Sequence, residues 1–247
     1  MKRALQIGIN YIGTQFELRG CINDVKKIQE CLRKDYGYTE FIQMTDDISE
    51  TTPGLIPTRN NILRTLTEIL QVSMPGDALF LQYSGHGTYV IDTSGDEKDG
   101  RDEAIVTCDS SLIIDDELNE ILEKYLNDSV QLFVLFDACH SGTNLDLTYQ
   151  LNVHNNQLLV HRQNRLCTKN IVYISGCTDS TTSADSKMEG KFCGAMTWAF
   201  LFALRKGKCI WPVLMRRMHA ILNRKGYPQQ PQICFSSYRK ALENVSL

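Results

Sequence analysis

Hydrophobic and polar positions along this chain follow two periods, one typical of buried strands and the other of amphipathic helices. Short continuous apolar runs indicate buried strands at 4–9, 41–44, 78–83, 131–136, 171–175 and 233–235. Apolar residues three and four positions apart indicate helices at about 23–32, 58–70, 116–126, 195–204 and 212–224. Strands that alternate with helices predict an α/β fold with a mostly parallel sheet and helices on both faces.

Two segments lack either period. Residues 91–103 are acidic and contain glycine, and residues 144–170 are polar and rich in Asn and Gln. Loops of this length inside a compact domain are usually functional or mobile. We therefore expect 144–170 to be the mobile part of the domain.

Composition and charge narrow the class of protein. Hydrophobic residues make up 43% of the 247 residues and charged residues 22%, which is ordinary for a globular protein. The net charge of −3, without a block of Lys and Arg, argues against a nucleic-acid partner. The first apolar run is too short for a signal peptide or a membrane span, so we expect a cytoplasmic protein without a membrane partner. The nine cysteines include no Cys-x-x-Cys pair, so we expect reduced thiols rather than disulfides or a structural zinc site.

Small and polar residues follow two of the predicted strands. Ser84-Gly85-His86-Gly87 comes after the strand at 78–83, and Asp137-Ala138-Cys139-His140-Ser141-Gly142 comes after the strand at 131–136. Ligands of parallel sheets bind beyond the carboxyl ends of the strands. A thiolate is a strong nucleophile, and an imidazole can take the thiol proton and return it to a leaving amine. Glycines leave backbone N–H groups free to stabilise an oxyanion.

Each of these residues also has a structural interpretation. An isolated cysteine is most often a small buried apolar residue, and an isolated histidine is usually only hydrogen-bonded. His140 competes with His86 as the base, but it is adjacent to Cys139, and neighbours at a strand end point apart. The residues alone therefore leave catalysis and structure about equally supported.

The motifs as a set resemble those of metacaspases, the caspase relatives of plants, fungi, protists and microbes. The segments that carry the resemblance are 83–87, 136–142, 20–24, 99–103, 114–117, 174–177, 182–185, 194–197 and 230–232. The resemblance implies a caspase-like fold with six to eight strands in a single domain over 1–247. Within it, 1–146 would be large-subunit-like, 147–170 the linker and 171–247 small-subunit-like.

The resemblance also assigns the catalytic roles. It implies a cysteine endopeptidase in which Cys139 attacks, His86 is the base, and the N–H groups of Gly87 and Cys139 form the oxyanion hole. No third residue that would orient His86 is evident, so the sequence predicts a dyad. A non-proteolytic regulatory or scaffold module on the same fold is the alternative, and retention of Cys139 and His86 argues against it.

Four residues match the substrate-pocket positions of the family, namely Cys21, Asp24, Ser84 and Asp137. Two carboxylates in a confined pocket would bind the guanidinium of Arg or the ammonium of Lys and repel an acidic side chain. We therefore expect protein or peptide substrates with a basic residue before the scissile bond (P1). A helix cap is the alternative role of Asp24, and a related endopeptidase of different specificity is the alternative if the pocket assignment fails.

A second carboxylate set matches the calcium ligands of calcium-dependent members, namely Asp102, Asp115, Asp116 and Asp146. Calcium takes several oxygen ligands, so the resemblance implies Ca²⁺ as an activator. The spacing between Asp92 and Asp102 is wrong for an EF-hand, and the other acids of that segment are expected to be solvated.

The same resemblance carries expectations about processing and assembly. Residues 144–170 contain Arg162, Arg165 and Lys169, which suit the predicted pocket and predict self-cleavage. The chain begins at its first predicted strand, so we expect a minimal member without a prodomain. We expect it to be a monomer.

Overall fold

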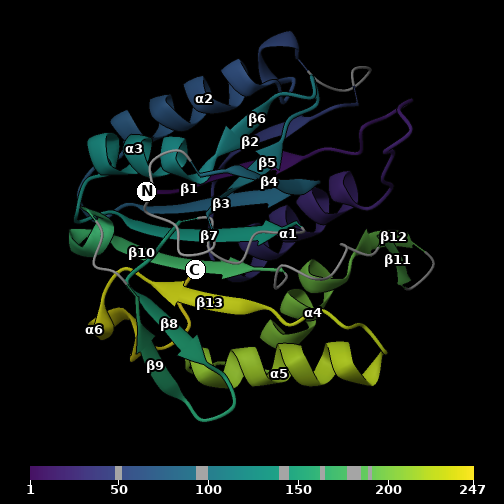
Figure 1. Ribbon diagram of the computed structural model, residues 1–247. Helices are drawn as coiled ribbons and strands as arrows, with labels where there is room; N and C mark the ends of the chain where they lie inside the picture. The colour runs from purple at the N-terminus through teal and green to yellow at the C-terminus, as the bar shows by residue number, and fades with distance from the viewer. Residues whose placement is uncertain (48–51, 93–99, 139–144, 162–164, 177–184, 189–190) are drawn as a thin grey trace.

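The structure is a computed structural model of residues 1–247 (Figure 1). It describes residues 1–47, 52–92, 100–138, 145–161, 165–176, 185–188 and 191–247. Among these residues, no helix is long and apolar enough to span a membrane.

One large sheet runs through the molecule. Its strands, in order across the sheet, are β2 (Glu40–Thr45), β1 (Lys2–Gly8), β3 (Ala78–Ser84), β7 (Gln131–Asp137), β10 (Asn170–Ser175), β13 (Gln232–Phe235), β8 (Tyr149–Asn152) and β9 (Gln157–Val160). The pairings from β2 to β10 are parallel, and β13, β8 and β9 add antiparallel pairings at one side. The predicted α/β fold with a mostly parallel sheet of six to eight strands is confirmed, and the sheet has eight strands.

Two small sheets lie beside the large one. The first is antiparallel and contains β4 (Gly87–Ile91), β5 (Arg101–Val106) and β6 (Leu112–Ile114). The second is the hairpin of β11 (Asp185–Met188) and β12 (Lys191–Gly194). In Figure 1 this hairpin lies near α1, beyond the arrowheads of the central parallel strands.

Helices cover both faces of the large sheet, as the sequence predicts. They are α1 (Cys21–Asp35), α2 (Arg59–Gln71), α3 (Asp115–Tyr125), α4 (Ala195–Leu204), α5 (Trp211–Arg224) and the short α6 (Tyr238–Ala241), with 3₁₀ turns at Pro53–Leu55 and Arg165–Thr168. Helices α2 and α3 pack on one face, and α1, α4 and α5 pack on the other.

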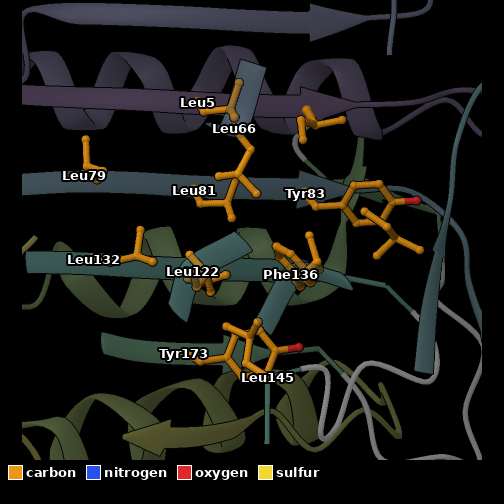
Figure 2. Close-up of a cluster of buried hydrophobic side chains, with 14 of the residues drawn as sticks. Leu5, Leu66, Leu79, Leu81, Tyr83, Leu122, Leu132, Phe136, Leu145 and Tyr173 are labelled. Atoms are coloured by element: carbon orange, nitrogen blue, oxygen red, sulfur yellow. The ribbon is translucent and has the colours of Figure 1, made fainter. Parts of the chain in front are cut away.

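The central strands are apolar throughout because they are buried on both faces. In β7, Leu132 and Phe136 lie in the cluster under α2 and α3, whereas Phe133 and Leu135 lie in the cluster under α1, α4 and α5. Figure 2 shows the first cluster, in which Tyr83 of β3 lies at the carboxyl end of its strand. Alternate side chains of one strand therefore pack into two different cores. The central strands for this reason lack the alternation of polar and apolar residues that is typical of a half-exposed strand.

The segment 144–170 differs from the expectation of a loop. It contains β8 and β9, which form the edge of the large sheet, and the 3₁₀ turn at Arg165–Thr168. Each strand has four residues, and most of them are only half-buried or exposed. The longest apolar run is the three residues 158–160 of β9, which is too short to mark a buried strand. The non-periodic segment 91–103 similarly contains the start of β5.

The first helix begins earlier than predicted, at Cys21 instead of Asn23 or Asp24. The side-chain oxygen of Asn10 accepts hydrogen bonds from the N–H groups of Cys21 at 3.0 Å and Ile22 at 3.4 Å. Asn10 therefore caps α1 from outside the helix, and the interpretation of Asp24 as the helix cap is wrong.

Candidate active site

The candidate site lies beyond the carboxyl ends of β3 and β7, which are neighbours in the sheet. Ser84 and Asp137 are paired across these parallel strands. His86 and Cys139 each come two residues after that pair. Cys139 and His140 lie outside the described residues. The register therefore brings Ser84 and Asp137, the last residues of the two strands, to one edge of the sheet.

The ring of His86 is held by a backbone carbonyl. Its Nε2 atom lies 2.8 Å from the carbonyl oxygen of Phe16. A carbonyl can only accept, so Nε2 carries the proton and Nδ1 is the free basic nitrogen. Phe16 therefore supplies a backbone partner for the imidazole that the sequence did not reveal. The pairing of His86 with Cys139 stays a prediction, because Cys139 lies outside the described residues.

Two buried tyrosines hold the backbone of His86. The hydroxyl of Tyr11 accepts from His86 N at 2.8 Å and donates to Val106 O at 2.7 Å. The hydroxyl of Tyr83 donates to His86 O at 2.6 Å. Burial raises the pKa of both tyrosines, so both hydroxyls stay protonated. The Tyr11 ring also lies against the imidazole, with the ring centroids 4.5 Å apart.

Gly85 leaves room for this arrangement. A Cβ atom at Gly85 would lie 2.6 Å from the Tyr83 hydroxyl and 2.9 Å from the Tyr11 hydroxyl. Either contact would push a tyrosine away from His86. Gly85 therefore has a structural role beside the predicted base.

The two predicted pocket carboxylates lie together. Asp24 is 1% exposed and Asp137 is 3% exposed. The Oδ2 atom of Asp24 accepts from Gly194 N at 2.9 Å, and that of Asp137 accepts from Thr197 N at 2.8 Å. A Cβ atom at Gly194 would overlap the Asp137 carboxylate and lie 2.8 Å from Asp24 Oδ2. Only glycine at 194 therefore lets both carboxylates approach the same point.

The N-terminus of α4 stabilises this charge. Thr197 is in the first turn of α4, whose N–H groups and helix dipole favour a nearby anion. The buried thiol of Cys193 has its pKa raised to about 11, by burial first and then by Asp24 and Asp137. Cys193 is therefore a neutral neighbour of the two carboxylates and not a second thiolate.

The remaining predicted residues lie around these groups. Cys21 is buried at the start of α1, and Ser84 is buried beside Asp137 in the sheet. Gly87 begins β4 directly after His86, and it is paired with Ile105 of β5. The oxyanion hole requires the N–H group of Cys139 as well, so it stays a prediction.

The predicted calcium ligands are only partly brought together. Asp102 on β5 and Asp115 at the start of α3 are buried, and their segments are adjacent because Ala104 pairs with Ile114. Asp146 lies instead close to Cys234 of β13. Within the described part of the chain, no three His, Cys, Asp or Glu side chains are placed so as to hold a metal ion. The described geometry therefore does not assemble a calcium site.

Comparison with known families decides the identity of the chain. The sequence model of the family described as "Metacaspase, peptidase C14 domain" matches residues 2–148, which is more than half of the chain. The chain belongs to the metacaspase family. Its members are cysteine peptidases, so this metacaspase is a cysteine endopeptidase, and the scaffold alternative is set aside.

Two metacaspases that align with 95% of this chain support the same family assignment. The metacaspase is 35% identical to Metacaspase-1B of Aspergillus fumigatus, with 95% of this chain and 69% of that protein covered. It is 34% identical to Metacaspase-1 of Ajellomyces capsulatus, with 95% and 80% covered. The similarity therefore extends well beyond residue 148.

Solved structures show the same fold. A crystal structure of a Geobacter sulfurreducens protein matches with a TM-score of 0.66 and 24% identity, over 98% of this chain and 97% of that one. Caspase-1 of Spodoptera frugiperda matches with a TM-score of 0.55 and 11% identity, over 96% and 86%. At these identities the likeness shows the caspase-like fold alone.

Proposed function

We propose that this metacaspase cleaves peptide bonds after Arg or Lys, with Cys139 as nucleophile and His86 as general base. The observation that carries the specificity is the convergence of two buried carboxylates, Asp24 and Asp137, on Gly194. A buried guanidinium or ammonium would be favoured there, and an acidic P1 side chain would be repelled.

The chemistry follows from the orientation of His86. Nδ1 accepts the Cys139 proton while the sulfur attacks the carbonyl carbon, and the N–H groups of Gly87 and Cys139 stabilise the oxyanion. His86 then gives the proton to the leaving amine as the C–N bond breaks. The Phe16 carbonyl, 2.8 Å from Nε2, stabilises the imidazolium that exists between these steps. Water then hydrolyses the acyl-enzyme.

The experiment that tests this proposal is cleavage of a peptide library that varies only at P1, with calcium and in chelator. We expect cleavage after Arg and Lys at rates at least about 100-fold above those after Asp, because a charge-paired contact in a desolvated site contributes a few kcal/mol. Equal cleavage after Asp would contradict the pocket assignment.

We propose that calcium stimulates this activity through Asp102, Asp115, Asp116 and Asp146, which is the role that these positions have in calcium-dependent relatives. The burial of Asp102 and Asp115 on adjacent segments supports the proposal, because neighbouring buried carboxylates repel one another until a cation joins them. Since the described geometry does not gather three ligands, we attribute no catalytic step to the ion.

Calcium is expected to raise the cleavage rate at about high-micromolar to millimolar concentration, and magnesium is expected to substitute poorly because it is smaller and geometrically stricter. The Asp115→Ala and Asp116→Ala variants should stay folded and lose the response. Equal rates in calcium and chelator would show that these carboxylates serve structure alone.

We also propose self-cleavage between β9 and β10, at Arg162 or Arg165. The Arg165 side chain is 81% exposed and makes one surface ion pair, to Glu123 at 3.2 Å. Lys169 is 12% exposed, and its ammonium contacts Asp128 Oδ1 at 2.8 Å and Leu126 O at 2.6 Å. Because a peptidase needs an accessible P1 side chain, Lys169 is a poor site although its residue type fits.

Incubated wild-type protein should show new termini after Arg162 or Arg165 by mass spectrometry, and Cys139→Ala should not. Both sides of the cut are held in the large sheet, by β8 and β9 on one side and β10 on the other. We therefore expect cleavage to be dispensable, so an Arg162→Ala/Arg165→Ala variant should keep its activity. A wholly inactive variant would show that processing is the activation step.

A further inference from the structure

The loop between β1 and α1, residues 10–20, carries two exposed apolar side chains, and one of them, Phe16, lies beside the general base. The Phe16 side chain is 61% exposed and Ile12 is 54% exposed. Phe16 lies edge-on to the imidazole of His86, with the ring centroids 6.4 Å apart. Neither side chain contributes to the core, and the catalytic role of Phe16 uses only its backbone carbonyl.

Hydrogen bonds fix the shape of this loop before any substrate binds. The carboxylate of Asp46 accepts from Asn10 N at 2.8 Å and from Ile12 N at 3.1 Å. Leu18 N donates to Asn10 O at 2.7 Å, and the side chain of Thr14 donates to Tyr11 O at 2.8 Å. An exposed apolar surface on a loop held in this way costs little further ordering when it binds an apolar group.

The reaction places one substrate residue against this surface. His86 must protonate the leaving amine, so the amine nitrogen lies within hydrogen-bond reach of Nδ1. The residue that carries this nitrogen is the one immediately after the scissile bond (P1′). The opposite edge of the same imidazole lies 2.8 Å from the carbonyl of Phe16. A P1′ side chain that passes along the ring therefore meets Phe16.

We propose that Phe16 forms the P1′ subsite and selects an apolar P1′ side chain. The proposal rests on the proposed function, because it needs His86 to act on the leaving amine. Apolar contact with Phe16 removes surface from water on both sides, whereas a glycine gains no contact and an aspartate is desolvated without a partner. The specificity of this enzyme is thus set on both sides of the scissile bond.

The test uses internally quenched peptides with Arg at P1 and Leu, Phe, Gly or Asp at P1′. Wild type should show kcat/KM for Leu and Phe about tenfold above that for Gly, as expected for partial burial of an apolar side chain. Phe16→Ala should bring this ratio close to one, because it removes the ring and keeps the carbonyl. Phe16→Lys should favour Asp at P1′ over Leu. The matched control is Phe202→Ala, which removes a partly exposed ring on α4 and should leave the ratio unchanged.

A second measurement separates this proposal from the proposed function. A peptidyl chloromethyl ketone with Arg at P1 alkylates the nucleophile and has no P1′ residue, so the rate of alkylation measures the reactivity of the nucleophile without any contact at P1′. Equal cleavage of all P1′ peptides by wild type, or an unchanged ratio in Phe16→Ala, would overturn the P1′ subsite and leave P1 specificity intact. A uniform loss of cleavage and alkylation in Phe16→Ala would overturn it too, because the ring would then position His86. Absence of any cleavage or alkylation in wild type would instead refute the proposed function.

Discussion

Replacing Cys139 with alanine is expected to lower the rate of peptide cleavage by at least about 10⁴-fold, which is the size of effect that loss of a nucleophile has in peptidases of this kind. No other group in the proposed mechanism can form the acyl-enzyme. His86→Ala should reduce the rate almost as far, because the thiol then has no base and the leaving amine no acid. The measurement is turnover of a P1-Arg peptide by purified protein in calcium.

The matched control for this pair is Cys31→Ala, which removes a partly buried thiol from α1. Burial raises the pKa of Cys31 to about 11, so this thiol is a poor nucleophile and its loss should leave turnover unchanged. Circular dichroism and thermal unfolding should show that all three variants are folded. Substantial turnover by Cys139→Ala would remove the assignment of the nucleophile.

Replacing Asp137 with asparagine is expected to reduce the preference for P1 Arg over a neutral P1 side chain by about 100-fold or more. The substitution keeps the shape of the side chain and one acceptor oxygen for Thr197 N, so the contact that holds the start of α4 can persist. What is lost is the negative charge beside Asp24. The measurement is the ratio of kcat/KM values between matched peptides, which cancels differences in the fraction of active enzyme.

Asp128→Asn is the control for Asp137→Asn. It removes the same charge from an exposed carboxylate that pairs with Lys169. Asp128 lies just before the start of β7, whereas Asp137 is at the carboxyl end of that strand. The P1 ratio of this control should equal that of wild type. If Asp137→Asn also kept the wild-type ratio, the P1 charge would be recognised elsewhere and the pocket assignment would be wrong.

The central strands and the helices that cover them could be predicted from sequence because buried elements require apolar residues at regular positions, and this pattern is visible within each segment. The runs at 78–83 and 131–136 are apolar on both faces, and the structure has β3 and β7 there. The hairpin of β8 and β9 could not be predicted in this way. Its strands have four residues each and are mostly half-buried or exposed, so they contain no long apolar run. They join the large sheet because β8 pairs with β13, which comes much later in the chain, and β9 pairs with β8.

The sequence by itself determined the fold class, the family and the residue types that do the chemistry. The fold class, the family and these residue types depend on which residues occur and in what order, and motifs such as Ser84–Gly87 contain that information. The strand ends also predicted that the base and the nucleophile come to one edge, because parallel strands end on the same side of a sheet.

Only the tertiary structure decided which groups surround those residues. The carbonyl of Phe16, which orients His86, belongs to the backbone, and every residue type has one, so no residue marks it. The convergence of Asp24 and Asp137 on Gly194 joins three segments that are far apart in the chain. For Asp24 the local sequence left a helix cap open as the alternative to a pocket role. In the folded chain Asn10 caps the helix, and the Asp24 carboxylate lies beside Gly194. The chemistry of a side chain depends on its residue type, which the sequence states. Which polar groups come into contact depends on the packing of segments that are far apart in the chain.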